Sequence, residues 1–173
     1  MILICFHGCG QNPTLFKSLL KPIKKQFSKD SKWLFPKGEW FKGHNKWGWY
    51  DRDYDENITE KGISLDDIIK YKSIGDCILI GFSEGGEFAL ELAQNLDNVK
   101  GVIAMSPSYN KTVEKLKINC PVVIISSINE NKIVKKYIVK WKKHILHSNL
   151  HEINHYKGHK VYIPPNIQNF IKF

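Results

Sequence analysis

The sequence has no hydrophobic run long enough to span a membrane. Its apolar stretches fall well short of the roughly 18 uninterrupted residues that a transmembrane helix needs. The apolar start at residues 1–6 ends at His7 and Gly8, and it lacks the basic n-region and small-residue cleavage site of a secretory signal. We therefore expect a soluble protein whose first segment is a buried strand.

Cysteine is sparse, with only four residues, at positions 5, 9, 77 and 120. They fall inside or beside apolar, strand-like runs and not at the regular spacing of a disulfide scaffold, which favours reduced thiols and a cytoplasmic location. Cys5, His7 and Cys9 alternate as ligands on one strand can, but no second ligand cluster follows. We therefore expect no metal, and we assign these residues packing and backbone roles.

The chain also lacks an arginine-rich stripe and any recognisable nucleic-acid-binding module, although its formal charge is +9, from 26 Lys and Arg against 17 Asp and Glu. The excess is mostly lysine, in groups such as residues 21–25 and 135–143 that have an amphipathic helical pattern. The outer faces of such helices are charged in any case. The composition therefore argues against nucleic acid as a partner, and a lysine-rich module for nucleic acid or acidic lipid surfaces is the less favoured alternative.

No internal repeat, low-complexity tract or linker divides the chain, and its length suits a single domain over residues 1–173. Apolar runs alternate with helical patterns throughout, which predicts an α/β fold with a mostly parallel sheet of about six strands flanked by helices. The expected strands are Ile2–Phe6, Trp33–Phe35, Cys77–Gly81, Val99–Met105, Val122–Ser126 and one near Leu150–Ile153. The expected helices are Pro13–Phe27, Thr59–Tyr71, Glu84–Leu96, Lys111–Leu116, Lys132–His144 and Pro165–Phe170.

One long irregular stretch, residues 36–57, is rich in aromatic side chains, among them Trp47, Trp49 and Tyr50. Long loops of this kind are often functional. The rings either line an apolar pocket for an acyl or alkyl group or simply cover the sheet, and both alternatives stay open.

The clearest chemical motif is Gly81-Phe82-Ser83-Glu84-Gly85, a G-x-S-x-G sequence between an apolar run and a helix-forming segment. This context is the one in which the motif forms a sharp strand-to-helix turn that exposes a nucleophile. Glycines give the turn room, and the helix N-terminus stabilises developing negative charge. We predict Ser83 as the nucleophile; the alternative is a glycine-rich turn with an N-capping serine.

The loop after the first strand, Phe6-His7-Gly8-Cys9-Gly10, should lie beside this turn, because the carboxyl ends of parallel strands share one edge. An acyl-transfer enzyme needs two N–H donors for the oxyanion, each contributing roughly 3 kcal/mol. We assign them to the backbone of Cys9 and Glu84. His7 is expected to brace the loop.

For the general base we predict His159, which follows the last expected strand on a glycine-preceded loop; His155 is the second candidate, and an exposed loop histidine is the alternative for either. In hydrolases with this serine turn, the acid lies between the serine and the histidine in the chain. Glu130 is favoured, because it lies just beyond a strand whose carboxyl end faces the same edge. Alternatively, Glu130 merely begins the following helix.

Together these segments resemble the phospholipase/carboxylesterase group of α/β-hydrolases that includes the acyl-protein thioesterases. The resemblance implies a compact α/β-hydrolase fold and a serine hydrolase that needs no cofactor. Its substrate would be a small-molecule or lipid-like ester or thioester, or an acylated protein. The residues that carry it are Phe6-His7-Gly8-Cys9-Gly10, Trp49-Tyr50-Asp51, Gly62-Ile63, Gly81-Phe82-Ser83-Glu84-Gly85-Gly86 and Gly101-Val102-Ile103-Ala104-Met105-Ser106.

The chain departs from this group where the acid is expected. The usual pattern there is G-x-x-D-x-x-V, and here Ser127 replaces the glycine and Glu130 the aspartate. Glutamate reaches one methylene further, so a triad is feasible. The substitution also supports the alternative of a weakly active or inactive hydrolase-fold protein that binds an acyl ligand or a protein partner.

Overall fold

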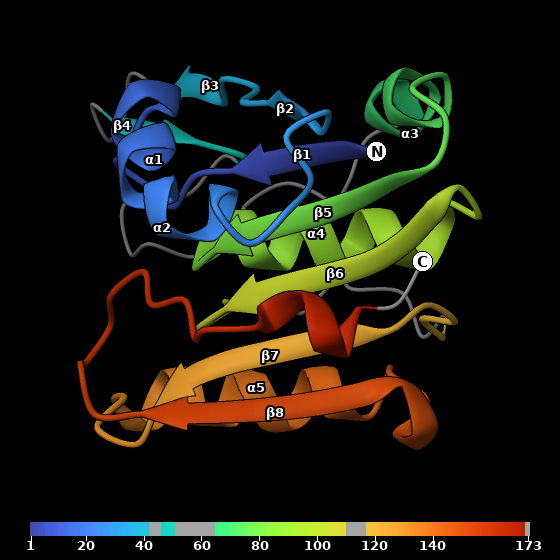
Figure 1. The fold of residues 1–173 in the computed structure, drawn as a ribbon. Helices are drawn as coiled ribbons and strands as arrows, with labels where there is room; N and C mark the ends of the chain where they lie inside the picture. Colours follow the sequence, from blue (N-terminus) through green and yellow to red (C-terminus); the bar gives the residue numbers. More distant parts are fainter. Residues whose placement is uncertain (42–45, 51–64, 110–116, 172–173) are drawn as a thin grey trace.

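A computed structural model describes residues 1–41, 46–50, 65–109 and 117–171. Its main feature is a six-stranded sheet in the order β2-β1-β5-β6-β7-β8, in which every neighbouring pair is parallel (Figure 1). A separate two-stranded antiparallel ribbon joins β3 and β4. The strands are β1 (Ile2–Phe6), β2 (Lys32–Leu34), β3 (Glu39–Phe41), β4 (Lys46–Gly48), β5 (Cys77–Phe82), β6 (Val99–Met105), β7 (Val122–Ser127) and β8 (Leu150–His155).

The predicted α/β fold and the mostly parallel sheet of about six strands are confirmed. All six predicted strands are present, each within two residues of the expected ends. The β3–β4 ribbon lies inside the stretch predicted to be irregular, and its pairing of Trp40 with Trp47 was not expected.

Helices cover both faces of the sheet (Figure 1). On one face lie α1 (Pro13–Leu19), α2 (Lys21–Lys24) and the 3-10 helix η2 (Ile167–Phe170); on the other lie α4 (Glu84–Asn95) and α5 (Lys132–Lys142). Because both faces are covered, β5 is buried along its whole length. The remaining helices are α3 (Leu65–Lys72) and η1 (His147–Asn149). Within the described ranges, no helix is both long and apolar enough to cross a membrane.

Several predicted segments fall on residues that the structure does not describe. These are residues 59–64 of the helix predicted from Thr59, the whole predicted helix Lys111–Leu116, and Asp51, Gly62 and Ile63 of the family resemblance. The single helix predicted over Pro13–Phe27 is divided at Leu20, which ends α1 and begins α2. The C-terminal helix is a short 3-10 turn instead.

The sheet topology positions the site. After β1 the chain moves outward to β2, and it later returns to the other side of β1 to form β5. The strand order therefore reverses between β1 and β5, and α/β proteins bind ligands at the carboxyl ends of the strands at such a point. The loop after β1 and the turn after β5 both open there.

Helix α4 begins in direct contact with the end of β1. A Cβ placed on Gly85 would lie 2.3 Å from the carbonyl oxygen of Phe6 and 2.5 Å from that of His7. Neither oxygen is on a flexible side chain, so only glycine allows the helix to approach the strand this closely.

We predict that Gly85→Ala destabilises the fold by about 3 kcal/mol, because the added methyl group has to push backbone away. Gly86→Ala is the matched control: its nearest neighbours lie at 3.3 Å, around Pro107, and alanine gains about 1 kcal/mol of helix propensity. Urea unfolding measures both. Equal stability of the two variants would contradict the close contact at Gly85.

His7, the residue directly after β1, is fully buried and braces the loop as a neutral imidazole. Its Nδ1 donates to the Gly8 carbonyl at 2.9 Å, and its Nε2 accepts the Gly38 N–H at 3.1 Å. Burial lowers the pKa of His7, while the bond to Gly8 and the charge of Glu84 act in the opposite direction. The predicted bracing role thus has a partner on each ring nitrogen.

We predict that the imidazole of His7 titrates below its usual value of about 6.5 in the folded protein, as read by nuclear magnetic resonance. Because the unfolded chain takes up this proton more readily, the contribution of His7 to the free energy of unfolding is present above about pH 6.5 and is lost as the pH falls. A midpoint for His7 above 6.5 would be inconsistent with a neutral brace.

Candidate active site

Ser83 lies at the junction of β5 and α4 with a φ of 53° and a ψ of −118°. For a residue other than glycine, this backbone conformation costs about 1–3 kcal/mol of strain energy. The Ser83 N–H donates to the Met105 carbonyl on β6 at 2.8 Å, and a Cβ on Gly81 would lie 2.1 Å from the Gly85 oxygen. The neighbouring strands and glycines therefore impose the strained turn that the G-x-S-x-G sequence predicts.

The loop after β1 packs against this turn. A Cβ on Gly8 would lie 2.9 Å from the ring of Phe82, the residue before Ser83. Gly10 adopts a positive φ of 76°, and its N–H donates to the Trp47 carbonyl at 2.7 Å. Cys9, exposed between the two glycines, and Glu84, the first residue of α4, belong to the two segments that meet here.

Glu130 and His159 form a hydrogen-bonded pair. Nδ1 of His159 lies 3.0 Å from Oε2 of Glu130, whose side chain is 0% exposed, against 40% for the histidine. The ring of His159 also lies 5.0 Å from the ring of Phe82. The structure thus brings an imidazole, oriented by a buried carboxylate, to the neighbour of Ser83.

Ser106, immediately after β6, holds the second oxygen of this carboxylate. Its hydroxyl donates to Oε1 of Glu130, and its N–H donates to the Ile125 carbonyl at 2.7 Å. Ser106 is buried and has a φ of 44°, one of three positive φ values at non-glycine residues in the described part of the chain. We did not predict this role; the available signal was a polar residue directly after a central strand.

Ser127, the other departure from the family pattern, anchors the loop that carries His159. Its hydroxyl donates to the His155 carbonyl at 3.2 Å and accepts the N–H groups of Gly158 at 3.0 Å and Asn129 at 3.2 Å. Gly158 has a positive φ of 71°. One hydroxyl therefore links the end of β7 to the residue just before His159.

His155, the second candidate for the base, is part of the framework of this loop. Its Nδ1 accepts the Lys157 N–H at 3.0 Å, and its ring packs 4.6 Å from Tyr162. Burial lowers the pKa of His155, with an opposing effect from Glu130. The geometry favours His159 over His155 as the partner of the carboxylate.

The carboxylate of Glu84 is buried and holds the aromatic segment. Its Oε1 accepts the N–H groups of Trp49 at 2.7 Å and Tyr50 at 3.0 Å, and the Tyr50 hydroxyl donates to Glu91 at 3.1 Å. Burial, followed by the charge of Glu91, raises the pKa of Tyr50. Trp49 stacks 4.8 Å from Phe88. For Trp49 and Tyr50 these contacts favour the alternative in which the rings cover the sheet.

Trp47 is placed differently. It lines an open surface hollow of about 710 Å³ together with Pro13, Leu15 and Lys37, and its carbonyl accepts the N–H of Gly10. Of the three aromatic residues predicted to line a pocket, Trp47 therefore borders a cavity next to the loop of Cys9.

The arrangement can carry out acid–base chemistry at a hydroxyl. When Nδ1 of His159 donates to Glu130, Nε2 is left as a proton acceptor. Within the described residues, Ser83 Oγ has no hydrogen-bond partner, and catalytic contacts of this kind often tighten only with substrate bound. No cluster of three or more metal-ligating side chains occurs in the described parts of the chain.

Comparisons with solved structures agree with this fold. Acyl-protein thioesterase 2 of Zea mays is 15% identical, with a TM-score of 0.66 over 97% of this chain and 89% of the other. A carboxylesterase of Bacillus cereus is 17% identical, with a TM-score of 0.64 over 94% and 82%. SOBER1 of Arabidopsis thaliana is 15% identical, with a TM-score of 0.64 over 94% and 91%. No curated protein matches the sequence.

Residues 55–160, more than half of the chain, match the Dienelactone hydrolase family. The matched segment contains Ser83, Glu130 and His159. It agrees with the resemblance to α/β-hydrolases seen in the sequence and with the parallel sheet seen in the structure. The chain belongs to the dienelactone hydrolase family of α/β-hydrolases.

Proposed function

We propose that this protein is a serine hydrolase that cleaves carboxylic esters or thioesters through an acyl-enzyme intermediate. The observation that carries the proposal is the hydrogen bond from His159 to the buried carboxylate of Glu130, beside the strained turn of Ser83. A nucleophile on a strand-to-helix turn, a base and an orienting carboxylate occur in the chain order typical of this fold. Family membership supports hydrolysis in general.

In the proposed mechanism, Nε2 of His159 takes the proton of Ser83 as Oγ attacks the substrate carbonyl carbon. The backbone N–H groups of Cys9 and Glu84 stabilise the oxyanion. The imidazolium then gives its proton to the departing alcohol or thiol as the acyl-enzyme forms. Water, activated by the same imidazole, attacks the acyl-enzyme, and a carboxylic acid leaves while Ser83 regains its proton.

Glu130 is proposed to orient His159 and to stabilise its charged form. Ser106 supports this role from the other side, because its hydroxyl occupies Oε1 and leaves Oε2 for the imidazole. The longer side chain of glutamate is thereby held by a hydrogen bond on each carboxylate oxygen. This contact argues for an active triad over the inactive alternative.

The proposed substrate is a small or lipid-like ester or thioester, or an acylated protein. The hollow bordered by Trp47, Pro13 and Leu15 offers apolar surface beside the loop of Cys9, which supports a site for an acyl or alkyl group. We further propose that residues 1–173 act as one domain in the cytoplasm, with no cofactor. The single six-stranded sheet supports the one-domain proposal.

We predict that a fluorophosphonate probe labels the wild-type protein at one site and leaves Ser83→Ala unmodified, because only Ser83 is activated by the imidazole. Ser73→Ala, which removes an exposed hydroxyl bonded to the Lys70 carbonyl, is the matched control and should label fully. Intact-protein mass spectrometry measures the labelling. Equal modification of Ser83→Ala and the wild type would refute the proposed nucleophile.

We predict that Glu130→Gln lowers kcat for p-nitrophenyl butyrate by several orders of magnitude, approaching the ~10⁴-fold loss seen when a triad acid is neutralised. Ser106→Ala should cost about 10- to 100-fold, because one hydrogen bond to the charged carboxylate is lost. Glu152→Gln removes a surface carboxylate that pairs with Lys142, and it should leave kcat unchanged. A loss below about threefold in Glu130→Gln would assign the acid elsewhere.

A further inference from the structure

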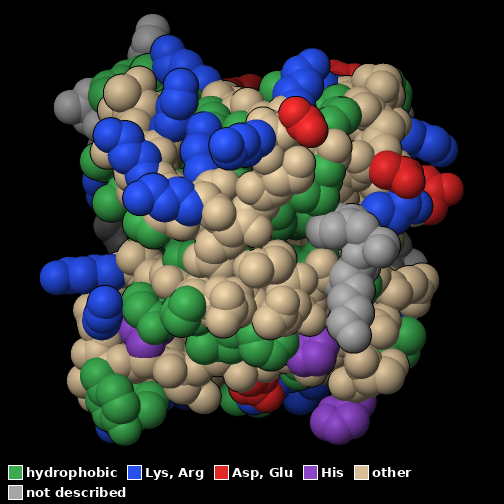
Figure 2. Space-filling model, viewed as in Figure 1, with side chains coloured by type: hydrophobic (Ala, Val, Ile, Leu, Met, Phe, Trp, Pro, Cys, Tyr) green, Lys and Arg blue, Asp and Glu red, His purple; other side chains and the backbone are tan. Residues whose placement is uncertain are grey.

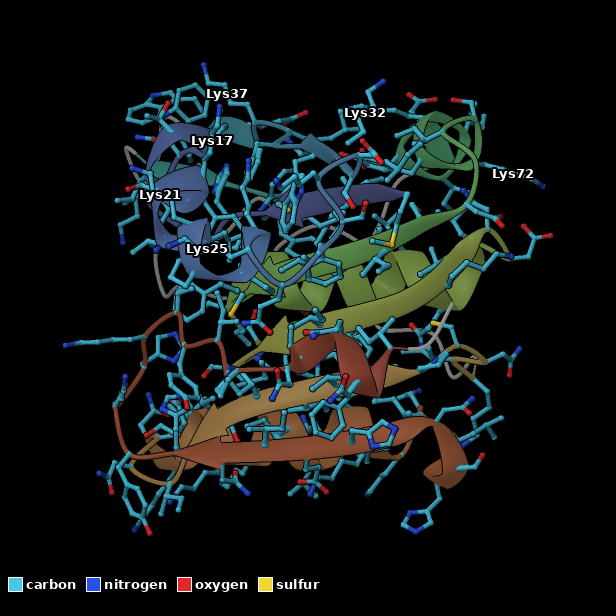
Figure 3. The ribbon with its side chains drawn as sticks, viewed as in Figure 1. Lys17, Lys21, Lys25, Lys32, Lys37 and Lys72 are labelled. Carbon is cyan, nitrogen blue, oxygen red and sulfur yellow. The ribbon has the colours of Figure 1, made fainter. Side chains whose placement is uncertain are left out.

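Lysines gather on one surface of the protein, over α1 and α2. The first 38 residues contain seven lysines and a single acidic residue, Asp30. Figure 2 shows this concentration of positive side chains, and Figure 3 shows Lys17, Lys21 and Lys25 along the two helices with Lys37 nearby. We call these four lysines, with the leucines Leu15 and Leu19, the basic face.

The spacing along the chain explains this face. The segment from α1 through α2 buries Phe16, Leu20 and Ile23 against the sheet. Lys17, Lys21 and Lys25 follow one another at intervals of four residues, and all three side chains are exposed on the outer side of this segment. Helix packing therefore directs one row of side chains inward and a row of cations outward.

The cations of the basic face have no acidic partner among the described residues. Two lysines elsewhere have such a partner: Lys100 lies 3.2 Å from Asp76, and Lys142 pairs with Glu152. Lys37 instead lies 3.7 Å from the centre of the Trp47 ring. The positive charge of this surface is thus not neutralised within the described structure.

Apolar side chains are interleaved with these lysines. Leu15 and Leu19, four residues apart on α1, are 46% and 38% exposed. Trp40, on the neighbouring ribbon, is 43% exposed and packs 5.0 Å from Trp47. A surface that combines lysines with exposed leucine and tryptophan suits the boundary between lipid headgroups and acyl chains.

The basic face lies near the end of the molecule where the strands terminate. In Figure 3, Lys17, Lys21, Lys25 and Lys37 lie toward the side to which the strand arrows point, whereas Lys72 lies toward the opposite side. Leu15 and Lys37 of this face line the hollow together with Trp47. The Trp47 carbonyl accepts the N–H of Gly10, so the hollow lies beside the loop of Cys9. A partner bound here would therefore sit beside the candidate site.

We propose that the basic face docks the protein onto anionic lipid bilayers. Lysines supply long-range attraction to acidic headgroups, and Leu15 and Leu19 insert at the level of the headgroups. Duplex nucleic acid would use the cations but not the exposed leucines. The docking depends on surface charge and not on turnover, so it stands or falls independently of the proposed hydrolysis.

Vesicle co-sedimentation tests the docking with the full chain. We expect the wild type to bind vesicles of phosphatidylcholine and phosphatidylserine, to bind phosphatidylcholine alone far more weakly, and to dissociate as salt is raised. The variant K17Q/K21Q/K25Q should bind the mixed vesicles about 100-fold more weakly. The matched control K135Q/K136Q/K143Q removes three exposed lysines near and on α5 and should bind like the wild type.

Two further measurements separate the contributions. Leu15→Ser/Leu19→Ser should weaken vesicle binding without altering its salt dependence, and circular dichroism melting checks that each variant is folded. Equal binding to vesicles with and without phosphatidylserine, or an equal loss in the α5 control, would overturn the proposal. Tighter binding to duplex DNA than to mixed vesicles at the same salt would also overturn it, in favour of a nucleic-acid surface.

Discussion

The close approach of α4 to the end of β1 is the constraint on which the site depends. With no side chain at Gly85, the helix begins within backbone contact of Phe6 and His7, and the turn that precedes it has to bend sharply at Ser83. The same approach brings the loop of Cys9 against Phe82. A larger residue at this position would move the helix, the turn and the loop together, because the three share these contacts.

Much of this arrangement could be predicted from the sequence because it depends on local patterns. Strands buried on both faces give continuous apolar runs such as Cys77 to Phe82, and the G-x-S-x-G context located the turn. The β3–β4 ribbon escaped prediction because its strands are three residues each and pair through a tryptophan contact that no short pattern signals. The packing of Trp49 and Tyr50 against the sheet has no local signal either, since their backbone N–H groups are held by Glu84, 34 residues further along the chain from Tyr50.

The candidate site residues also fall into two groups, those that the sequence indicates and those that it does not. Their position just after a strand is enough to predict Glu130 and His159 as site residues, because the residues that follow parallel strands lie at the same edge of the sheet. Ser106 and Ser127 were not assigned roles, since a serine hydroxyl has no sequence signal for which carboxylate or amide it meets. Their contacts nevertheless explain how the structure accommodates the two departures from the family pattern, Ser127 and Glu130. Ser127 fixes the loop before His159, and Ser106 bonds to the longer side chain of Glu130.

Glu84 connects two functions that are usually considered separately. Its backbone N–H is proposed to stabilise the oxyanion, while its carboxylate accepts hydrogen bonds from the backbone N–H groups of Trp49 and Tyr50. The first residue of α4 is therefore fixed by a segment of chain from outside the helix. If the proposed oxyanion role holds, the side chain of residue 84 matters as well as its backbone, because its carboxylate ties the first residue of α4 to Trp49 and Tyr50.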